Sequence, residues 1–156
     1  MVLAAVKRLW AILAVVLTAC AHAQPIPQVA SIHGVSVELV KSGNQCFLHY
    51  QGKQLDLGIE EKCFFLVDNQ GKPIIKYYDD IGASVVIVAG GVLDLSGYKQ
   101  PPEFAKPEAC GQQSKGLIVS KSGEVSLSAF SSTSMIFCPD SKADEKVYWL
   151  FGHKQP

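Results

Sequence analysis

The side chains that could carry proton-transfer chemistry in this 156-residue chain are few and scattered. Of its four histidines, one lies in an N-terminal apolar segment and three are spread over the rest of the chain, at His33, His49 and His153. A histidine acts as a general base only with a nucleophile or a carboxylate within reach. No serine occupies the G-x-S-x-G pattern of a hydrolase elbow. We therefore predict no catalytic site, and expect His49, beside Tyr50, to be an ordinary strand residue.

The densest group of polar and aromatic side chains is the run Tyr77, Tyr78, Asp79 and Asp80. Neighbouring side chains on a strand point to opposite faces, so the two carboxylates are not expected to converge as an acid–base pair. A calcium loop would need more oxygen ligands at set spacing. Two interpretations remain: aspartates in a hairpin turn, or an edge that recognises a partner through its tyrosines.

Four cysteines, Cys46, Cys63, Cys110 and Cys138, follow Cys20. Their spacing does not match that of zinc ligands, and an even number in an exported chain predicts two disulfides. Three pairings are possible, and we favour the two between sequence neighbours, Cys46–Cys63 and Cys110–Cys138. Each would stabilise the fold by about 3–4 kcal/mol in the chain-entropy description. We predict no metal and no cofactor.

Residues 1–23 have the layout of an export signal, with Lys7 and Arg8 ahead of a short apolar run. Two cleavage sites overlap. The sequence LTAC, ending at Cys20, resembles the lipobox of bacterial lipoproteins and would place a lipid on Cys20. The sequence AHA, ending at Ala23, is a site for cleavage that discards Cys20. The sequence favours neither and predicts a periplasmic protein or an outer-membrane lipoprotein facing the periplasm.

The charge composition argues against nucleic acid as a partner. Removing Lys7 and Arg8 from 14 basic residues leaves 12 against 14 acidic ones, a net charge of −2, and every remaining base is a lysine. Nucleic-acid sites depend on basic patches and arginine forks. Contact with a membrane is expected only through a lipid on Cys20.

The remaining pattern predicts short strands separated by glycine turns. Residues 24–34, with two prolines, are expected to form an extended tether, and residues 35–156 a single β domain. Apolar residues of both parities at 84–88 indicate a central strand buried on both faces. Residues 99–116 predict a long proline-rich loop, 141–144 a single helical turn, and 147–151 a last strand that buries Trp149 or its neighbours. The fold class is all-β, or mainly β with a short helix: an antiparallel sandwich or partly closed barrel stapled by two disulfides.

These features favour a small non-enzymatic module that binds another envelope or secreted protein, as an inhibitor or immunity protein does. An accessory or structural lipoprotein of an envelope assembly is the alternative, and an envelope enzyme that uses His49, Asp79 or Asp80 is a third hypothesis. A sheet edge or the long loop would make the contact. The candidate contact residues are Tyr77, Tyr78, Asp79, Asp80, Lys99, Glu103 and Phe104.

Overall fold

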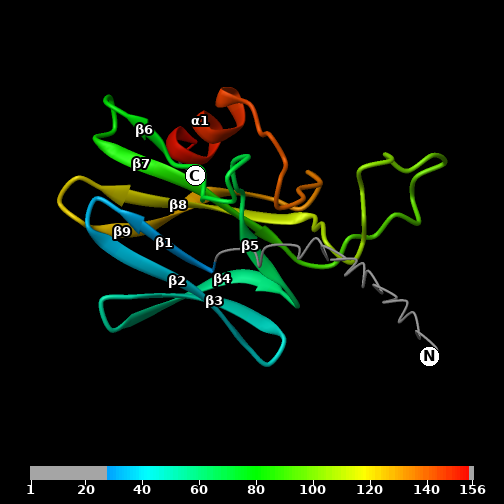
Figure 1. The fold of residues 1–156 in the computed structure, drawn as a ribbon, viewed down its shortest axis with the longest axis horizontal. Helices are drawn as coiled ribbons and strands as arrows, with labels where there is room; N and C mark the ends of the chain where they lie inside the picture. The colour runs from blue at the N-terminus through cyan, green and yellow to red at the C-terminus, as the bar shows by residue number, and fades with distance from the viewer. Residues whose placement is uncertain (1–27, 155–156) are drawn as a thin grey trace, which may run out of the picture.

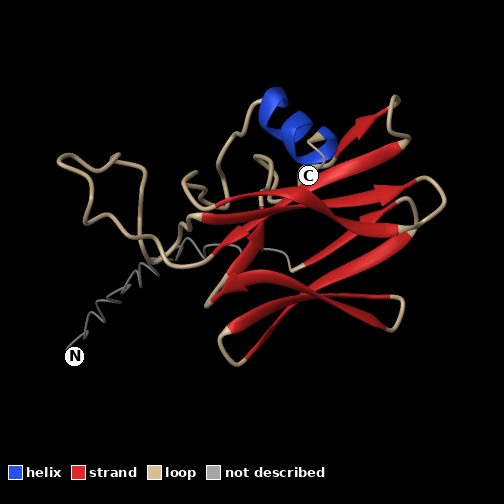
Figure 2. Ribbon diagram, turned by 180° about the vertical axis from the view of Figure 1, so that it is seen from behind, coloured by secondary structure: helices blue, strands red, loops and turns tan. Residues whose placement is uncertain are grey.

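The computed structural model describes residues 28–154 and consists of two antiparallel β-sheets with one helix packed on the outside (Figures 1 and 2). The predicted export signal, both cleavage sites and Cys20 lie outside the described residues. The elements in chain order are β1 (Val29–Ile32), β2 (Val35–Ser42), β3 (Gln45–Tyr50), β4 (Lys53–Glu60), β5 (Cys63–Phe65), β6 (Lys76–Tyr78), β7 (Ala83–Gly90), β8 (Gln113–Ser120), β9 (Val125–Ser132) and α1 (Glu145–His153).

The two sheets are built from local hairpins. The first has the order β1-β2-β3-β4, and the second has the order β5-β7-β8-β9, with β6 pairing β7 beside β5. Every strand pair is antiparallel, and the sheets face each other without closing into a barrel. The predicted fold class, mainly β with a short helix and two disulfides, is therefore confirmed in its sandwich form.

Strand β7 lies at the centre of the molecule, as its sequence predicted. All eight of its residues are buried. Val86 and Val88 join the core between the two sheets, whereas Val85 and Ile87 join a second core beneath α1. Since alternate side chains leave a strand on opposite faces, a strand covered on both faces must be apolar at both parities.

Both predicted disulfides are present, Cys46–Cys63 and Cys110–Cys138. The first joins β3 to the start of β5, and so links the two sheets. The second joins the end of the long loop to the segment that leads towards α1.

The predicted tether over residues 24–34 is wrong in its second half. Residues 29–32 form β1, which pairs with β2 and buries Ala30 and Ile32. His33 and Gly34, both with positive φ, make the two-residue turn between them. The alternation of exposed and buried residues in β1 extends over only four residues and follows two prolines. It is therefore too short to identify the strand from the sequence.

The predicted last strand over residues 147–151 is helix α1. Asp144 caps its first turn by accepting a hydrogen bond from the Val147 amide at 3.0 Å. Tyr148, Phe151 and Gly152 face the core at helical spacing, so the neighbours of Trp149 are buried while Trp149 itself is 47% exposed. The nine residues of α1 are too few to cross a bilayer, and no helix within 28–154 has the length and apolarity of a membrane span.

Candidate functional site

The segment between β7 and β8, residues 91–112, projects from one end of the sandwich (Figures 1 and 2). It borders a groove of about 860 Å³, whose other wall is the segment that leads from β9 to α1. Most of the lining side chains are apolar, and the charged ones are two lysines and one aspartate. The lining residues are Val67, Phe104, Lys106, Ala109, Cys110, Ile136, Phe137, Cys138, Pro139, Asp140, Ser141, Lys142 and Ala143.

Several contacts fix the two walls of this groove relative to each other. Cys110 and Cys138, one from each wall, form the second disulfide and are almost fully buried. Next to it, the Gly111 and Phe137 backbones exchange hydrogen bonds of 2.8 and 2.9 Å. The loop also turns back on itself, since the Cys110 amide donates to the Lys106 carbonyl at 2.7 Å. These contacts make the groove a preformed feature of the fold.

Two further contacts hold the base of the loop on the sandwich. Lys62, at the β4–β5 turn, donates from its ammonium group to the carbonyl of Pro107. Burial lowers the pKa of the Lys62 amine, and the carboxylates of Glu61 and Glu108 oppose that shift. Gly90 and Gly111 lie so close together that a Cβ atom on Gly111 would lie 1.9 Å from the Gly90 carbonyl oxygen.

Phe104 is the most exposed large hydrophobic side chain in residues 28–154, with 59% of its surface accessible. It lines the groove together with buried Phe137 and half-buried Ile136. Lys99 and Glu103, the other loop residues predicted to contact a partner, are exposed on the same loop but do not line the groove.

The other predicted contact residues lie at the opposite end of β7. Tyr77 and Tyr78 belong to β6, and Asp79 and Asp80 form the turn that leads into β7 at Ala83. The groove begins beyond Gly90, at the far end of β7, so the sequence-predicted residues form two separate surfaces (Figure 1).

In the group formed by residues 77–80, the side chains of Tyr78 and Asp80 contact residues of α1 in the same chain. The Tyr78 hydroxyl donates to Glu145 Oε1 at 2.6 Å, and burial together with this carboxylate raises the pKa of Tyr78. Asp80 Oδ2 lies 2.7 Å from Nε2 of His153. Both contacts attach α1 to the β6–β7 hairpin. Tyr77 remains 37% exposed on the other face of β6.

The sheet edges offer little backbone for an added strand. Strands β1, β5 and β6 have four, three and three residues. The two long edge strands are irregular, because the ladder between β3 and β4 shifts register at Cys46/Phe47 and that between β8 and β9 shifts at Lys115/Leu117. Short and bulged edges are the devices by which proteins avoid pairing with other strands.

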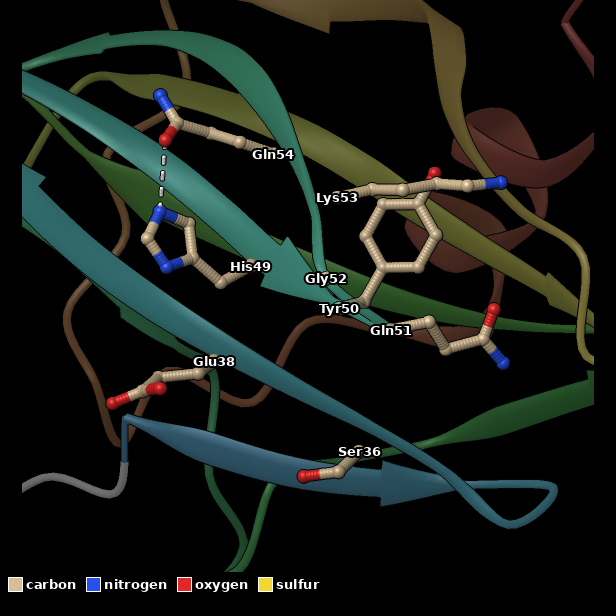
Figure 3. A pocket seen from close by; sticks show the side chains of 8 residues that line it. All are labelled: Ser36, Glu38, His49, Tyr50, Gln51, Gly52, Lys53 and Gln54. Atoms are coloured by element: carbon tan, nitrogen blue, oxygen red, sulfur yellow. Dashed lines mark hydrogen bonds between the residues drawn. The ribbon is translucent and has the colours of Figure 1, made fainter.

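His49 lies in a shallow hollow of about 400 Å³ on the outer face of the first sheet (Figure 3). Its Nε2 atom is 3.0 Å from Oε1 of Gln54, its cross-strand neighbour. Glu38 is opposite His49 on β2, and Ser36 lines the same hollow, yet neither has a hydrogen bond to the imidazole within the described residues. Asp79 and Asp80 do not line this hollow, so the predicted enzyme residues do not share a cleft there.

A serine–histidine pair that sequence reasoning missed lies elsewhere, between Ser84 Oγ and His33 Nε2, 2.9 Å apart. Ser84 is 2% exposed, so a substrate cannot reach its hydroxyl in this structure. In the described part of the chain, no carboxylate is hydrogen-bonded to His33. The pair fastens the β1–β2 turn to β7. In the sequence, this contact was indicated only by the His33-Gly34 turn between two stretches in which polar and apolar residues alternate.

Metal binding finds no support in residues 28–154, where no three His, Cys, Asp or Glu side chains gather closely enough to hold an ion. Of the two hollows described above, the groove beside Phe104 is the larger and has the more apolar lining. No family model, no curated protein and no solved structure matches this chain.

Proposed function

We propose that this protein is a non-enzymatic protein-binding module of the bacterial envelope, of the inhibitor or immunity type, and that it holds a segment of its partner in the groove beside Phe104. The observation that carries the proposal is an apolar groove whose two walls are joined by a disulfide and which displays an aromatic side chain that is 59% exposed. Aromatic side chains, phenylalanine among them, are enriched at the centres of protein interfaces, and the residues that dominate binding cluster in well-packed pockets.

The rigidity of the groove supports protein binding on energetic grounds. Ordering a rotamer-rich side chain at an interface costs about 0.5–1.5 kcal/mol, and ordering a flexible loop costs more. Here the disulfide and the backbone pair Gly111–Phe137 hold the walls before any partner arrives. The short and bulged sheet edges favour this groove over strand addition as the mode of contact.

The chemistry of the lining indicates the kind of segment that would fit. Phe104, Ile136 and Phe137 offer apolar contact, and Lys106 and Lys142 approach from the two walls against a single acid, Asp140. A partner segment with a bulky apolar side chain followed by a carboxylate would match both features.

Site-specific cross-linking tests the proposal. A photo-reactive phenylalanine analogue at position 104 should capture one envelope or secreted protein in living cells. The same analogue at Trp149, an exposed aromatic position on α1, is the matched control and should not capture it. Adding Ile136→Asp should abolish capture from position 104. Equal capture from both positions, or none from 104, would remove the support for a groove-bound partner.

Export and lipid attachment are part of the same proposal. The signal over residues 1–23 and the two disulfides suit an oxidising compartment. Metabolic labelling with a palmitate analogue should mark the wild-type chain and not Cys20→Ser if the lipobox is used. Unlabelled protein that begins at Gln24 would show that the second cleavage site is used instead.

A further inference from the structure

The outer face of the first sheet carries a row of polar side chains across three neighbouring strands. Glu38 on β2 lies directly opposite His49 on β3, and His49 lies directly opposite Gln54 on β4. These side chains leave the sheet on the same face, because the residues that alternate with them, such as Leu39 and Leu48, are buried in the core between the sheets. The three side chains therefore belong to one surface, and all of them line the hollow shown in Figure 3.

The size of this hollow, about 400 Å³, lies within the range of small-molecule sites. Two further polar side chains line it: Ser36, two residues before Glu38 on β2, and Gln51 in the turn between β3 and β4. From strand geometry, the row from Glu38 to Gln54 spans about 10 Å, and Ser36 is about 7 Å from Glu38 along the strand. These dimensions match a ligand of one or two sugar rings.

The polar side chains of the hollow present donors and acceptors side by side. His49 Nε2 lies 3.0 Å from Oε1 of Gln54. Because an amide oxygen only accepts, the imidazole donates this hydrogen bond, which leaves Nδ1 of the neutral ring as an acceptor and the Gln54 amide nitrogen as a donor. The Glu38 carboxylate only accepts, and it forms no salt bridge within the described residues. A ligand that both donates and accepts at closely spaced positions therefore fits this row.

An aromatic ring lies beside this polar row on the same face. Phe47, two residues before His49 on β3, is half-buried, and half-buried Val40 is directly opposite it on β2. Neither side chain is part of the core between the sheets or of the core beneath α1. A sugar has both matching surfaces, because its ring C–H groups contact the electron-rich face of an aromatic ring and its hydroxyl groups donate and accept hydrogen bonds.

The charges that line the hollow argue against an ionic ligand and against sugar cleavage. Glu38 is its only acid and Lys53 its only lysine, so neither an anion nor a cation meets a cluster of opposite charge. Lys53 also lies over the Tyr50 ring, with its ammonium group 5.9 Å from the ring centre. Glycoside hydrolysis ordinarily needs two carboxyl groups beside the scissile bond, and the hollow has one. Its chemistry is that of binding a neutral ligand.

We propose that the outer face of the first sheet binds a neutral saccharide, with Glu38, His49 and Gln54 hydrogen-bonded to its hydroxyl groups and Phe47 against its ring. This inference does not rest on the proposed function, since the hollow and the groove share no lining residue. One chain could then hold a saccharide and a protein at the same time. Because the hollow is shallow and its ligand stays partly in water, we expect a Kd of about 1 mM.

Titration of the ¹⁵N-labelled, exported Cys20→Ser chain, followed by NMR, tests the proposal. The probes are glucose, N-acetylglucosamine, maltose and chitobiose, each raised to about 20 mM, well above the expected Kd. At least one should shift the amide resonance of Glu38 and the side-chain amide of Gln54 in a saturable way, and leave Gly111 and Phe137 at the groove unchanged. Inorganic phosphate should shift neither. No saturable shift with any of the four sugars, or an equal response to phosphate, would overturn the proposal.

Three variants assign the binding to this face. Glu38→Ala should raise the Kd of the responding sugar at least about tenfold, the loss of a hydrogen bond to a charged group. Phe47→Ala should also raise it, through loss of the ring contact. Phe104→Ala is the matched control: it alters only the groove, so it should leave sugar binding unchanged. Unchanged binding by Glu38→Ala, or weakened binding by Phe104→Ala, would contradict the assignment. None of the three side chains is buried, and the dispersion of the same spectra confirms folding.

Discussion

Removing each disulfide in turn separates the stability of the fold from the geometry of the groove. Cys46–Cys63 closes a loop with a sequence separation of 17, and Cys110–Cys138 one of 28. With the chain-entropy relation, these separations give losses of about 3.1 and 3.6 kcal/mol in the free energy of unfolding. Double alanine variants of the two pairs should therefore be destabilised by similar amounts in urea titrations.

Their effects on the groove should differ strongly. The amides of Gly111 and Phe137 form the backbone pair next to Cys110–Cys138. Without that disulfide, we expect their hydrogen exchange to accelerate at least about tenfold beyond the change in global stability, because the groove walls can then open locally. Without Cys46–Cys63, their exchange should follow the global stability alone.

Native-state hydrogen exchange by NMR, at urea concentrations where both variants remain folded, measures this difference. Core amides of β7, such as those of Val86 and Val88, report global opening in the same spectra. If the Gly111 and Phe137 amides lose protection equally in the two variants, the disulfide does not hold the groove and the reasoning is refuted.

Three further changes test the packing around the site. Tyr148 is fully buried and its hydroxyl has no hydrogen-bond partner in the described residues, so Tyr148→Phe should stabilise the fold by about 1 kcal/mol in thermal or urea unfolding; a loss of that size would reveal a missed partner. The Tyr78 hydroxyl lowers the pKa of Glu145, so the contribution of this carboxylate to the free energy of unfolding is present above its unfolded-state pKa and is lost as pH falls through the lower folded-state value. Glu145→Gln should therefore lower the free energy of unfolding by about 0.5 kcal/mol at pH 7 and leave it unchanged near pH 2. A loss of stability that persists in acid would exclude this ionic origin. Gly111→Ala should raise the exchange rate of loop amides, since its Cβ would clash with the Gly90 carbonyl, and unchanged exchange would show that the loop base can shift.

The local patterns of this chain predicted the features that depend on local chemistry. Strand β7 was evident at 84–88 because a strand buried on both faces needs apolar side chains at both parities. The pairing Cys46–Cys63 followed from hairpins that keep sequence neighbours close. The long loop was evident from its prolines, and the structure places Phe104 of that loop in the groove.

The features that were missed depend on contacts distant in sequence. An aromatic run at 147–151 fits a strand or a helix equally well, and the core beneath α1 selects the helix by covering Tyr148 and Phe151. The separation of the Tyr77–Asp80 group from the loop is likewise a product of topology, because β7 runs from one to the other. No spacing in the sequence carries that information.

The affinity of the partner captured from position 104 tests the central claim most directly. Isothermal titration calorimetry of that partner with wild type, Phe104→Ala and Trp149→Ala compares two exposed aromatic positions, one in the groove and one on α1. We predict that Phe104→Ala raises Kd at least about 30-fold, the loss of about 2 kcal/mol that marks an interface hot spot, and that Trp149→Ala leaves it unchanged. An unchanged Kd for Phe104→Ala, with weakened binding by Trp149→Ala, would contradict the account.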